Sequence, residues 1–414
     1  MNRRVEKYLK SRAVTLPWVA TGTDRSDFSV AIVIPVLAER DTLPEILDSL
    51  CRNSAEYLSQ TLIILVINNR VNCSSAELLE NQHTLNWLGT TPYPGLNLAW
   101  VDASSGGLEL PEKDGVGLAR KIGFDAALLR IDWQVDPLLV SLDADTLVDS
   151  NYLSAIFDHF SEQHNRVAVL PFHHQSAPSP RQEKAIRHYE LYLRSYLFGL
   201  SLAGSPYAFH SIGSAFSCRA DAYIRVGGMN RRCGGEDFYF LQQLAKITAV
   251  NLVSGTVVHP SSRFSQRVPF GTGRVVQQQV DSDTIPFHFV PVAGFKILKQ
   301  WLDLIRCHVD SSADQISRHS LDISTDLNQF LLELGFSPVW KKLQKNHSSR
   351  EQRLAAFHCW FDALRTRQLL TRIGDESLSV ERLVAVLLEW GGYGEIEGEP
   401  AQLRLLENLQ GVQQ

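Results

Sequence analysis

Four short apolar runs constrain the fold of this chain more than any other feature. They cover residues 30–35, 62–67, 96–101 and 138–142. Each is too short for a typical helix and suits a buried strand. Amphipathic segments separate them, for example residues 115–130, which carry apolar side chains at helical spacing. Strands that alternate with helices indicate α/β units joined by right-handed crossovers, and hence a mostly parallel sheet flanked by helices.

Two acidic residues, Asp143 and Asp145, follow the last of these runs. They should lie at the carboxyl edge of the sheet, where open α/β sheets bind their ligands. Two carboxylates there can share one hard cation with a bound diphosphate. A second D-x-D pair, Asp281 and Asp283, has no apolar run before it, so the motif alone is weak evidence. The position of Asp143 and Asp145 directly after an apolar run therefore supports the prediction of a metal-dependent nucleotide site.

Other strand ends in this half of the chain are polar as well. Glu39 lies in the loop after the first run, and Asn68 and Asn69 follow the second. Residues 42–45 read as a capping box for the next helix. Neither the G-x-G-x-x-G nor the G-x-x-x-x-G-K-[ST] phosphate cradle occurs where it would be needed. A bound diphosphate would then depend on a cation, which the D-x-D pair offers.

A second group of acids, Glu236 and Asp237, follows two glycines and opens a predicted helix. Acids in a first turn stabilise a helix through its dipole, so a purely local role is one explanation. Adjacent helical residues point about 100° apart, so only one of the two can face a cleft. One of them can cap the helix while the other acts in catalysis.

A histidine and a basic loop follow a last predicted strand over residues 250–258. His259 ends this strand, and Arg263, Arg267 and Arg274 lie in the glycine-bearing loop beyond it. Guanidinium groups and backbone amides suit phosphate contacts. A lone histidine is commonly structural, but at a strand end His259 is a candidate metal or phosphate contact.

Composition limits the class of protein. Hydrophobic residues make up 44% and charged residues 21% of the 414 residues, as in ordinary globular proteins. The net charge of -5 argues against nucleic acid as a partner. Six scattered cysteines and the lack of a secretory signal favour a cytoplasmic protein. No apolar run is long enough to span a membrane, although a peripheral membrane contact stays open.

The chain from about residue 285 onward carries helical spacing. The predicted helices cover residues 295–307, 326–334, 351–370 and 380–390, before a polar tail. We therefore expect a leader over residues 1–28, an α/β domain over residues 29–275, and a C-terminal helical region over residues 276–414.

With these residues in view, the chain resembles the family 2 glycosyltransferases with the GT-A fold over roughly residues 30–273. The resemblance depends on several segments in the family's order. They are Val33-Ile-Pro35 with Glu39 beyond it, Ala119-Arg120 with Gly123, Leu142-Asp-Ala-Asp145, residues 219–228, and Gly235-Glu-Asp237. The helical C-terminal region lies outside it.

The resemblance implies a role for each matching position. Asp145 would bind Mn²⁺ or Mg²⁺, with Asp143 in the metal shell or on the ribose, and His259 resembles a metal contact of some relatives. Asp237 would be the general base and Glu236 its alternative. Donor contacts would come from Pro35, Glu39, Asn68, Asn69, Arg120, Asp143, Arg263 and Arg267. Many members have acids where this chain has Asn68 and Asn69, which leaves the nucleobase undetermined.

The expected activity is transfer of a single sugar from a nucleotide-diphosphate sugar to an acceptor hydroxyl, with inversion. The acceptor could be a glycan, a lipid-linked molecule or a small molecule. The Q-x-x-R-W element of processive members is missing, which argues against a polysaccharide synthase. Two alternatives stay open: a sugar nucleotidyltransferase, and a catalytically degenerate protein that binds nucleotide sugars.

Overall fold

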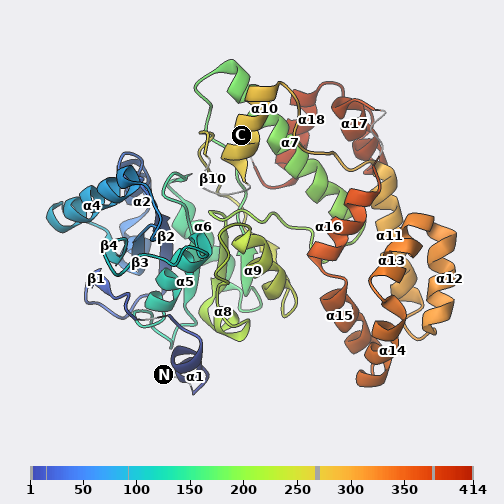
Figure 1. Ribbon diagram of the computed structural model, residues 1–414, viewed down its shortest axis with the longest axis horizontal. Helices are drawn as coiled ribbons and strands as arrows, with labels where there is room; N and C mark the ends of the chain where they lie inside the picture. Colours follow the sequence, from blue (N-terminus) through green and yellow to red (C-terminus); the bar gives the residue numbers. More distant parts are fainter. Residues whose placement is uncertain (1–2, 15, 92, 266–270, 375–377, 413–414) are drawn as a thin grey trace. The chain divides into compact units, whose positions relative to one another are not determined.

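The computed structural model describes residues 3–14, 16–91, 93–265, 271–374 and 378–412. The chain forms two compact units (Figure 1). The α/β unit comprises residues 1–186, 211–281 and 411–414, and the helical unit comprises residues 187–210 and 282–410. Both units are discontinuous in sequence, whereas the expected domains are consecutive segments. Arg267, an expected donor contact, lies outside the described residues.

An eight-stranded sheet forms the centre of the α/β unit. Its order is β1-β4-β3-β2-β5-β8-β7-β9, and β4, β3, β2 and β5 run parallel. A second, two-stranded sheet pairs β10 with β6. The strands are β1 (Ala20–Gly22), β2 (Val30–Val36), β3 (Thr61–Asn68), β4 (Asn97–Ala103), β5 (Leu138–Ser141), β6 (Leu147–Val148), β7 (Val167–Val169), β8 (Phe216–Arg219), β9 (Asn251–Leu252) and β10 (Val258–His259). The expectation of a mixed α/β fold around a mostly parallel sheet is confirmed.

The register of the central strands brings their ends to one edge. Val33 of β2 pairs with Ile64 of β3 on one side and with Ser141 of β5 on the other. All eight residues of β3 are buried, as expected for a strand with helices on both faces of its sheet. Loops that follow β2, β3 and β5 therefore leave the sheet together.

Helices accompany this sheet in the α/β unit (Figure 1). They are α1 (Arg3–Ser11), α2 (Leu43–Cys51), α3 (Ala55–Ser59), α4 (Ser75–Thr90), α5 (Val116–Ala127), α6 (Tyr152–Ser161), α8 (Ala220–Arg225), α9 (Glu236–Ala245) and α10 (Thr272–Ser282), with the first turns of α7 (Pro180–Leu202). Helix α5 packs on β2 and β3. Gly123 makes this approach possible, because a Cβ there would lie 2.3 Å from Cγ1 of Val33. The close packing positions Arg120, one turn earlier on α5.

Two local predictions for the α/β unit are wrong. The single strand expected over residues 250–258 is instead β9 and β10, which pair with β7 and β6 respectively. Gly255 lies between them with φ +83°, a left-handed conformation that a continuous strand does not contain. The capping box at Thr42 does not form either. The Thr42 hydroxyl donates to Oε2 of Glu39 at 2.8 Å instead of capping α2.

Within the described residues, the helical unit is built from the rest of α7 and from eight further helices. They are α11 (Val292–Cys307), α12 (Ala313–Ile323), α13 (Thr325–Glu333), α14 (Phe336–Asn346), α15 (Arg350–Trp360), α16 (Ala363–Arg372), α17 (Val380–Trp390) and α18 (Glu399–Leu409). Trp301, Trp340 and Phe357 lie in its core. The C-terminal helices are confirmed. However, the helix expected over residues 351–370 is two helices, because Asp362 caps α16 by accepting from the Arg365 amide.

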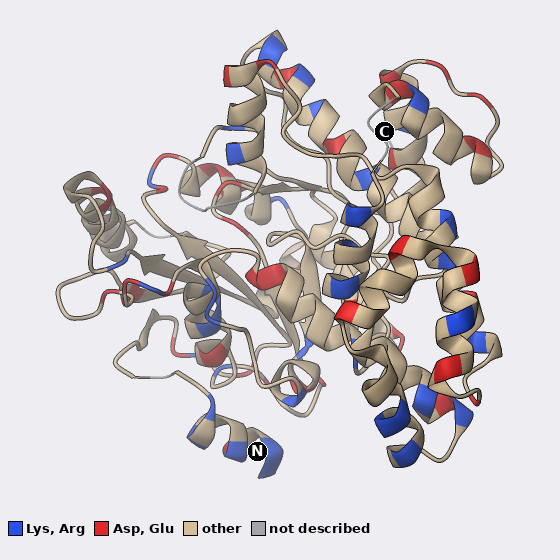
Figure 2. Cartoon of the chain, turned by 45° about the vertical axis from the view of Figure 1, so that its right-hand side comes forward, with Lys and Arg blue, Asp and Glu red and all other residues tan. Residues whose placement is uncertain are grey.

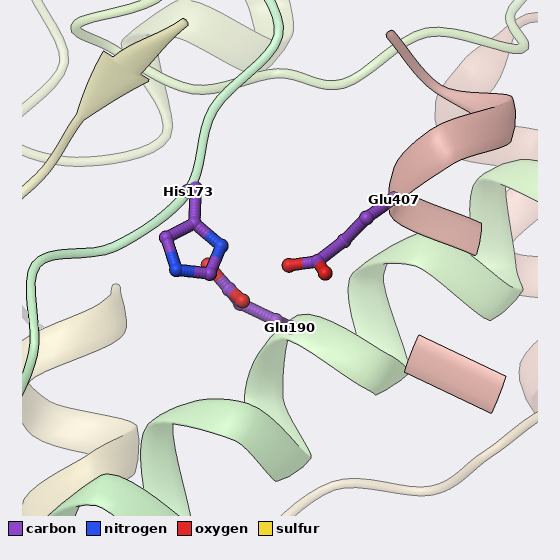
Figure 3. Close-up of side chains that lie close together, drawn as sticks. All are labelled: His173, Glu190 and Glu407. Carbon is purple, nitrogen blue, oxygen red and sulfur yellow. The ribbon is translucent and has the colours of Figure 1, made fainter. Parts of the chain in front are cut away.

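Two buried carboxylates of the helical unit point toward one another. Glu190 comes from α7 and Glu407 from α18 (Figure 3), and an oxygen of each lies within 4.8 Å of the other. Nη1 of Arg187 lies 2.9 Å from Glu190, and Nη2 of Arg194 lies 3.9 Å from Glu407. The two arginines offset this negative charge, so we interpret the pair as part of a buried ion network.

Across the described ranges, no helix is both long enough and apolar enough to cross a membrane.

Candidate active site

Acidic residues gather at the carboxyl edge of the parallel strands. Glu39 follows β2, while Asp143 and Asp145 follow β5, the neighbour of β2 in the sheet. Glu236 and Asp237 open α9 after Gly235, whose φ of +67° suits glycine. Two contacts connect the groups, since Arg120 bridges Asp143 to Glu236 and Arg263 bridges Asp145 to Glu39. The structure thus brings five predicted carboxylates into one connected region.

Arg120 is the buried centre of this region. Its Nη2 donates to Asp143 at 2.5 Å, its Nε donates to Glu236 at 3.0 Å, and its Nη1 donates to the Ser141 hydroxyl at 2.7 Å. Burial opposes the charge, but Asp143 and Glu236 together raise the pKa of Arg120. Only 2% of the side chain is exposed. Its N–H groups are therefore occupied by the protein itself, whereas the resemblance implied a contact with the sugar donor.

Arg263 occupies a more open position. Its Nη2 donates to Glu39 and lies 2.8 Å from Oδ2 of Asp145. Burial alone would lower the pKa of Arg263. Glu39 and Asp145 raise it by more than burial lowers it, so the net shift is upward. A third of the side chain, 33%, is exposed. This guanidinium can therefore be reached by a ligand that approaches the carboxylates.

Asp145 lies among like charges. Burial and the charges of Asp143 and Glu39 together outweigh the lowering effect of Arg263 and raise the pKa of Asp145 to about 6, with burial the largest cause. About a quarter of the side chain, 24%, is exposed. A carboxylate in this setting gains more from a bound cation than an isolated surface acid does, because the cation relieves the repulsion from its neighbours.

His259 lies beside Asp145 through the small second sheet. It pairs with Leu147, two residues after Asp145. The Gln175 amide joins the two positions by donating to the Asp145 carbonyl at 2.9 Å and to the His259 carbonyl at 2.7 Å. However, Nε2 of the His259 ring lies 3.0 Å from Asp149. The imidazole is thus near the D-x-D pair and engaged by a third acid.

Asp237 and Glu236 differ in their surroundings. Glu236 is buried against Arg120. Asp237 is half-buried, and its Oδ1 accepts from the Phe238 amide at 2.7 Å. Burial raises the pKa of Asp237 well above its usual range, and the charge of Glu236 raises it further. A carboxylate with a raised pKa accepts a proton more strongly than an ordinary one, and a general base works best when its pKa lies near the operating pH.

The two asparagines after β3 are buried and engaged by the backbone. The Asn68 amide donates to the carbonyls of Val36 and Val66, and the Asn69 amide donates to those of Arg70 and Ser104. Their side-chain donors hold strand ends together instead of facing a nucleobase. Pro35, within β2, is half-buried.

Asn81 on α4 completes this arrangement and was not predicted. It is fully buried, accepts from the Ala38 amide at 2.9 Å, and donates to the Asn68 carbonyl at 3.0 Å and to Oδ1 of Asn69 at 2.9 Å. It thereby fixes the loops after β2 and β3. The signal in the sequence is an asparagine on the core-facing side of a helix, between Leu78 and Leu88 at helical spacing.

The donor set fits a hard divalent cation. Asp143 and Asp145 offer carboxylate oxygens, the ligand type that Mg²⁺ and Mn²⁺ prefer. In the structure, the Arg263 guanidinium lies between Glu39 and Asp145, so a positive charge is already accommodated between these carboxylates.

Comparisons with known proteins find distantly similar solved structures but assign no family to the chain. No family model and no curated protein matches the chain. S. aureus TarS 1-349 in complex with UDP-GlcNAc is 11% identical over 92% of this chain and 91% of that chain, with a TM-score of 0.39. The mannosyltransferase PcManGT from Pyrobaculum calidifontis, in complex with GDP-Man and Mn²⁺, is 14% identical over 99% of this chain and 92% of that chain, with a TM-score of 0.38. Such distant likeness leaves the function to be argued from the chain's own site.

Proposed function

We propose that the chain is a metal-dependent glycosyltransferase of the GT-A type, which moves one sugar from a nucleotide-diphosphate sugar to an acceptor hydroxyl. The observation that carries this proposal is the grouping of Glu39, Asp143 and Asp145 at one sheet edge, connected through Arg120 to Glu236 and Asp237. Five carboxylates around two arginines leave an excess of negative charge, which favours a divalent cation as a partner.

In this proposal Asp143 and Asp145 hold the cation, with His259 at the edge of its shell. When bound, the cation would supply neutralising charge for the diphosphate leaving group. Arg263 contacts the donor's phosphates, because its exposed guanidinium can form charge-assisted hydrogen bonds with them. Glu39 lies beside it and would contact the nucleoside. Pro35 and the buried Asn68 and Asn69 shape the floor beneath this part of the site.

Asp237 takes the proton from the acceptor hydroxyl. Its raised pKa and its half-exposed position distinguish it from Glu236, which is buried against Arg120. We assign Glu236 and Arg120 to positioning, since together they hold Asp143 and the start of α9 in place. A single base facing the acceptor is consistent with direct displacement at the anomeric carbon, and hence with inversion.

The test is turnover of a panel of nucleotide sugars with Mn²⁺ or Mg²⁺. We expect slow metal-dependent hydrolysis of one donor, releasing the nucleoside diphosphate, because water can replace a missing acceptor. A nucleotidyltransferase would instead release pyrophosphate from a nucleoside triphosphate and a sugar phosphate. Binding of a nucleotide sugar without any turnover of the panel would favour the degenerate binding protein and contradict the proposal.

A further inference from the structure

The N-terminal helix presents a basic stripe to solvent. Helix α1 buries Val5 and Tyr8 against the α/β unit and exposes Arg3, Lys7 and Lys10. Positions 3, 6, 7 and 10 share one side of a helix, opposite positions 5 and 8, so this side carries three cations and the exposed Glu6 and keeps an excess of positive charge. Figure 2 shows blue segments in the helix beside the N-terminus.

The inner face of α1 is held firmly. The Tyr8 hydroxyl donates to Oδ1 of Asp125 at 2.8 Å and accepts from Lys121 at 2.8 Å. The Val14 amide donates to Oδ2 of the same aspartate at 2.9 Å. Both partners lie on α5, the helix that carries Arg120. The basic stripe is therefore fixed to the unit that holds the candidate active site.

Exposed apolar side chains follow this stripe. Leu16 is 78% exposed, the highest value for a large hydrophobic residue in the described ranges, and Val19 is 63% exposed. Between them, the Trp18 indole donates to the Leu108 carbonyl at 2.7 Å, which anchors the segment. Leu16 is six residues from Lys10, so the two lie within about 20 Å of each other. A single scattered leucine has no special meaning, but two beside an anchored cationic stripe suit the boundary of a lipid bilayer.

From this geometry we infer that residues 3–14 and 16–19 form a docking surface for an anionic membrane. Arg3, Lys7 and Lys10 attract anionic headgroups, while Leu16 and Val19 enter the apolar boundary beneath them. The acidic character of the whole chain does not oppose this contact, because membrane attraction decays within a Debye length and depends on the local face. The inference concerns a surface outside the candidate active site and does not depend on the proposed activity.

The experiment is sedimentation of the full chain with phosphatidylcholine vesicles, with or without phosphatidylglycerol. We expect binding to the anionic vesicles alone and release by salt. The triple variant Arg3→Gln, Lys7→Gln, Lys10→Gln should weaken the partition about a hundredfold. Its matched control, Lys341→Gln, Lys342→Gln, Lys345→Gln, removes three exposed lysines of α14 in the helical unit and should leave the partition unchanged.

A second pair of variants tests the apolar part. Leu16→Ser with Val19→Ser should weaken the partition severalfold, whereas Leu332→Ser on α13, where the leucine is 62% exposed, should not. Far-UV circular dichroism checks that each variant is folded. If the triple variant unfolds, two measurements still test the membrane contact. They are the release of the wild type from anionic vesicles by salt and the partition of the Leu16→Ser, Val19→Ser variant. No binding of the wild type to anionic vesicles, or equal loss in the α1 and α14 variants, would overturn the inference.

Discussion

Two arginines of the α/β unit each lie between two acidic residues, yet their surroundings differ. Arg120 is 2% exposed and donates to Asp143, Glu236 and Ser141. Arg263 is 33% exposed, and one of its nitrogens contacts both Glu39 and Asp145. A buried and fully paired guanidinium holds its partners in place, whereas an accessible one can exchange its partners for a ligand. Burial therefore separates the framework of the site from the part that we expect to bind the donor.

The largest expected effect concerns the residue that the framework positions. Asp237→Asn keeps the shape of the side chain but removes the proton acceptor. We expect transfer, or donor hydrolysis, to fall by about 10²- to 10⁴-fold, with donor affinity unchanged. Turnover assays and calorimetric titration of the same preparation give the two numbers. Retained turnover would remove Asp237 from the role of base and would return Glu236 to consideration.

The next effect tests the framework directly. Arg120→Ala leaves Asp143 and Glu236 without their shared cation, so we expect a loss of about 3 to 5 kcal/mol in the free energy of unfolding. Arg263→Ala is the matched control and should cost no more than about 1 kcal/mol, because its pairs are partly solvated. Denaturant titration followed by circular dichroism measures both values. Equal losses would show that burial does not separate the two arginines.

Removal of the Arg263 side chain should change the affinity for Mn²⁺ and the affinity for nucleoside diphosphate in opposite directions. Arg263→Ala removes a cation that competes for Asp145, so Mn²⁺ alone should bind more tightly. Nucleoside diphosphate with Mn²⁺ should bind about ten- to a hundredfold more weakly, because charge-assisted hydrogen bonds to the phosphates are lost. Arg318→Ala, which changes an exposed arginine on α12 of the helical unit, is the control and should change neither. A change of the same sign in both titrations would contradict the assignment.

The smallest effect is a dependence of stability on pH. The folded-state pKa of Asp237 lies well above its ordinary value of 3.8, because burial and the charge of Glu236 disfavour the ionised carboxylate. Below that pH both folded and unfolded states are protonated and the carboxyl contributes nothing. As pH rises, the unfolded chain ionises first, so the wild type loses stability until the folded carboxyl ionises too. The stability gain of Asp237→Asn over the wild type should therefore grow with pH, and a difference that stays constant would contradict the raised pKa.

The sequence indicated the strand ends of the site because they depend on local pattern. Apolar runs located β2, β3 and β5, and the residues directly after them placed Glu39 and Asp143 at one edge. The helices of the C-terminal part followed from apolar spacing in the same way, although α12, α14 and α18 were missed.

Partners distant in the chain could not be predicted. Arg120 meets Glu236 across 116 residues, and Arg263 meets Glu39 across 224 residues. A pattern of spacing contains no information on such pairs. The buried Asn68 and Asn69 show the same limit, because a polar residue after a strand can face a ligand or satisfy the backbone, and only the packing of Asn81 decides between them.

The central claim is that the Asp143 and Asp145 edge binds a nucleoside diphosphate through a divalent cation. The most direct measurement is calorimetric titration of UDP and GDP into the wild type and Asp145→Asn, with Mn²⁺ or with a chelator. We predict that the wild type binds one of the two nucleotides tightly when Mn²⁺ is present and not when the chelator is present, because a diphosphate beside bare carboxylates is repelled. The Asp145→Asn variant should bind the same nucleotide weakly in both conditions. Equal affinity of the wild type in both conditions would contradict the account.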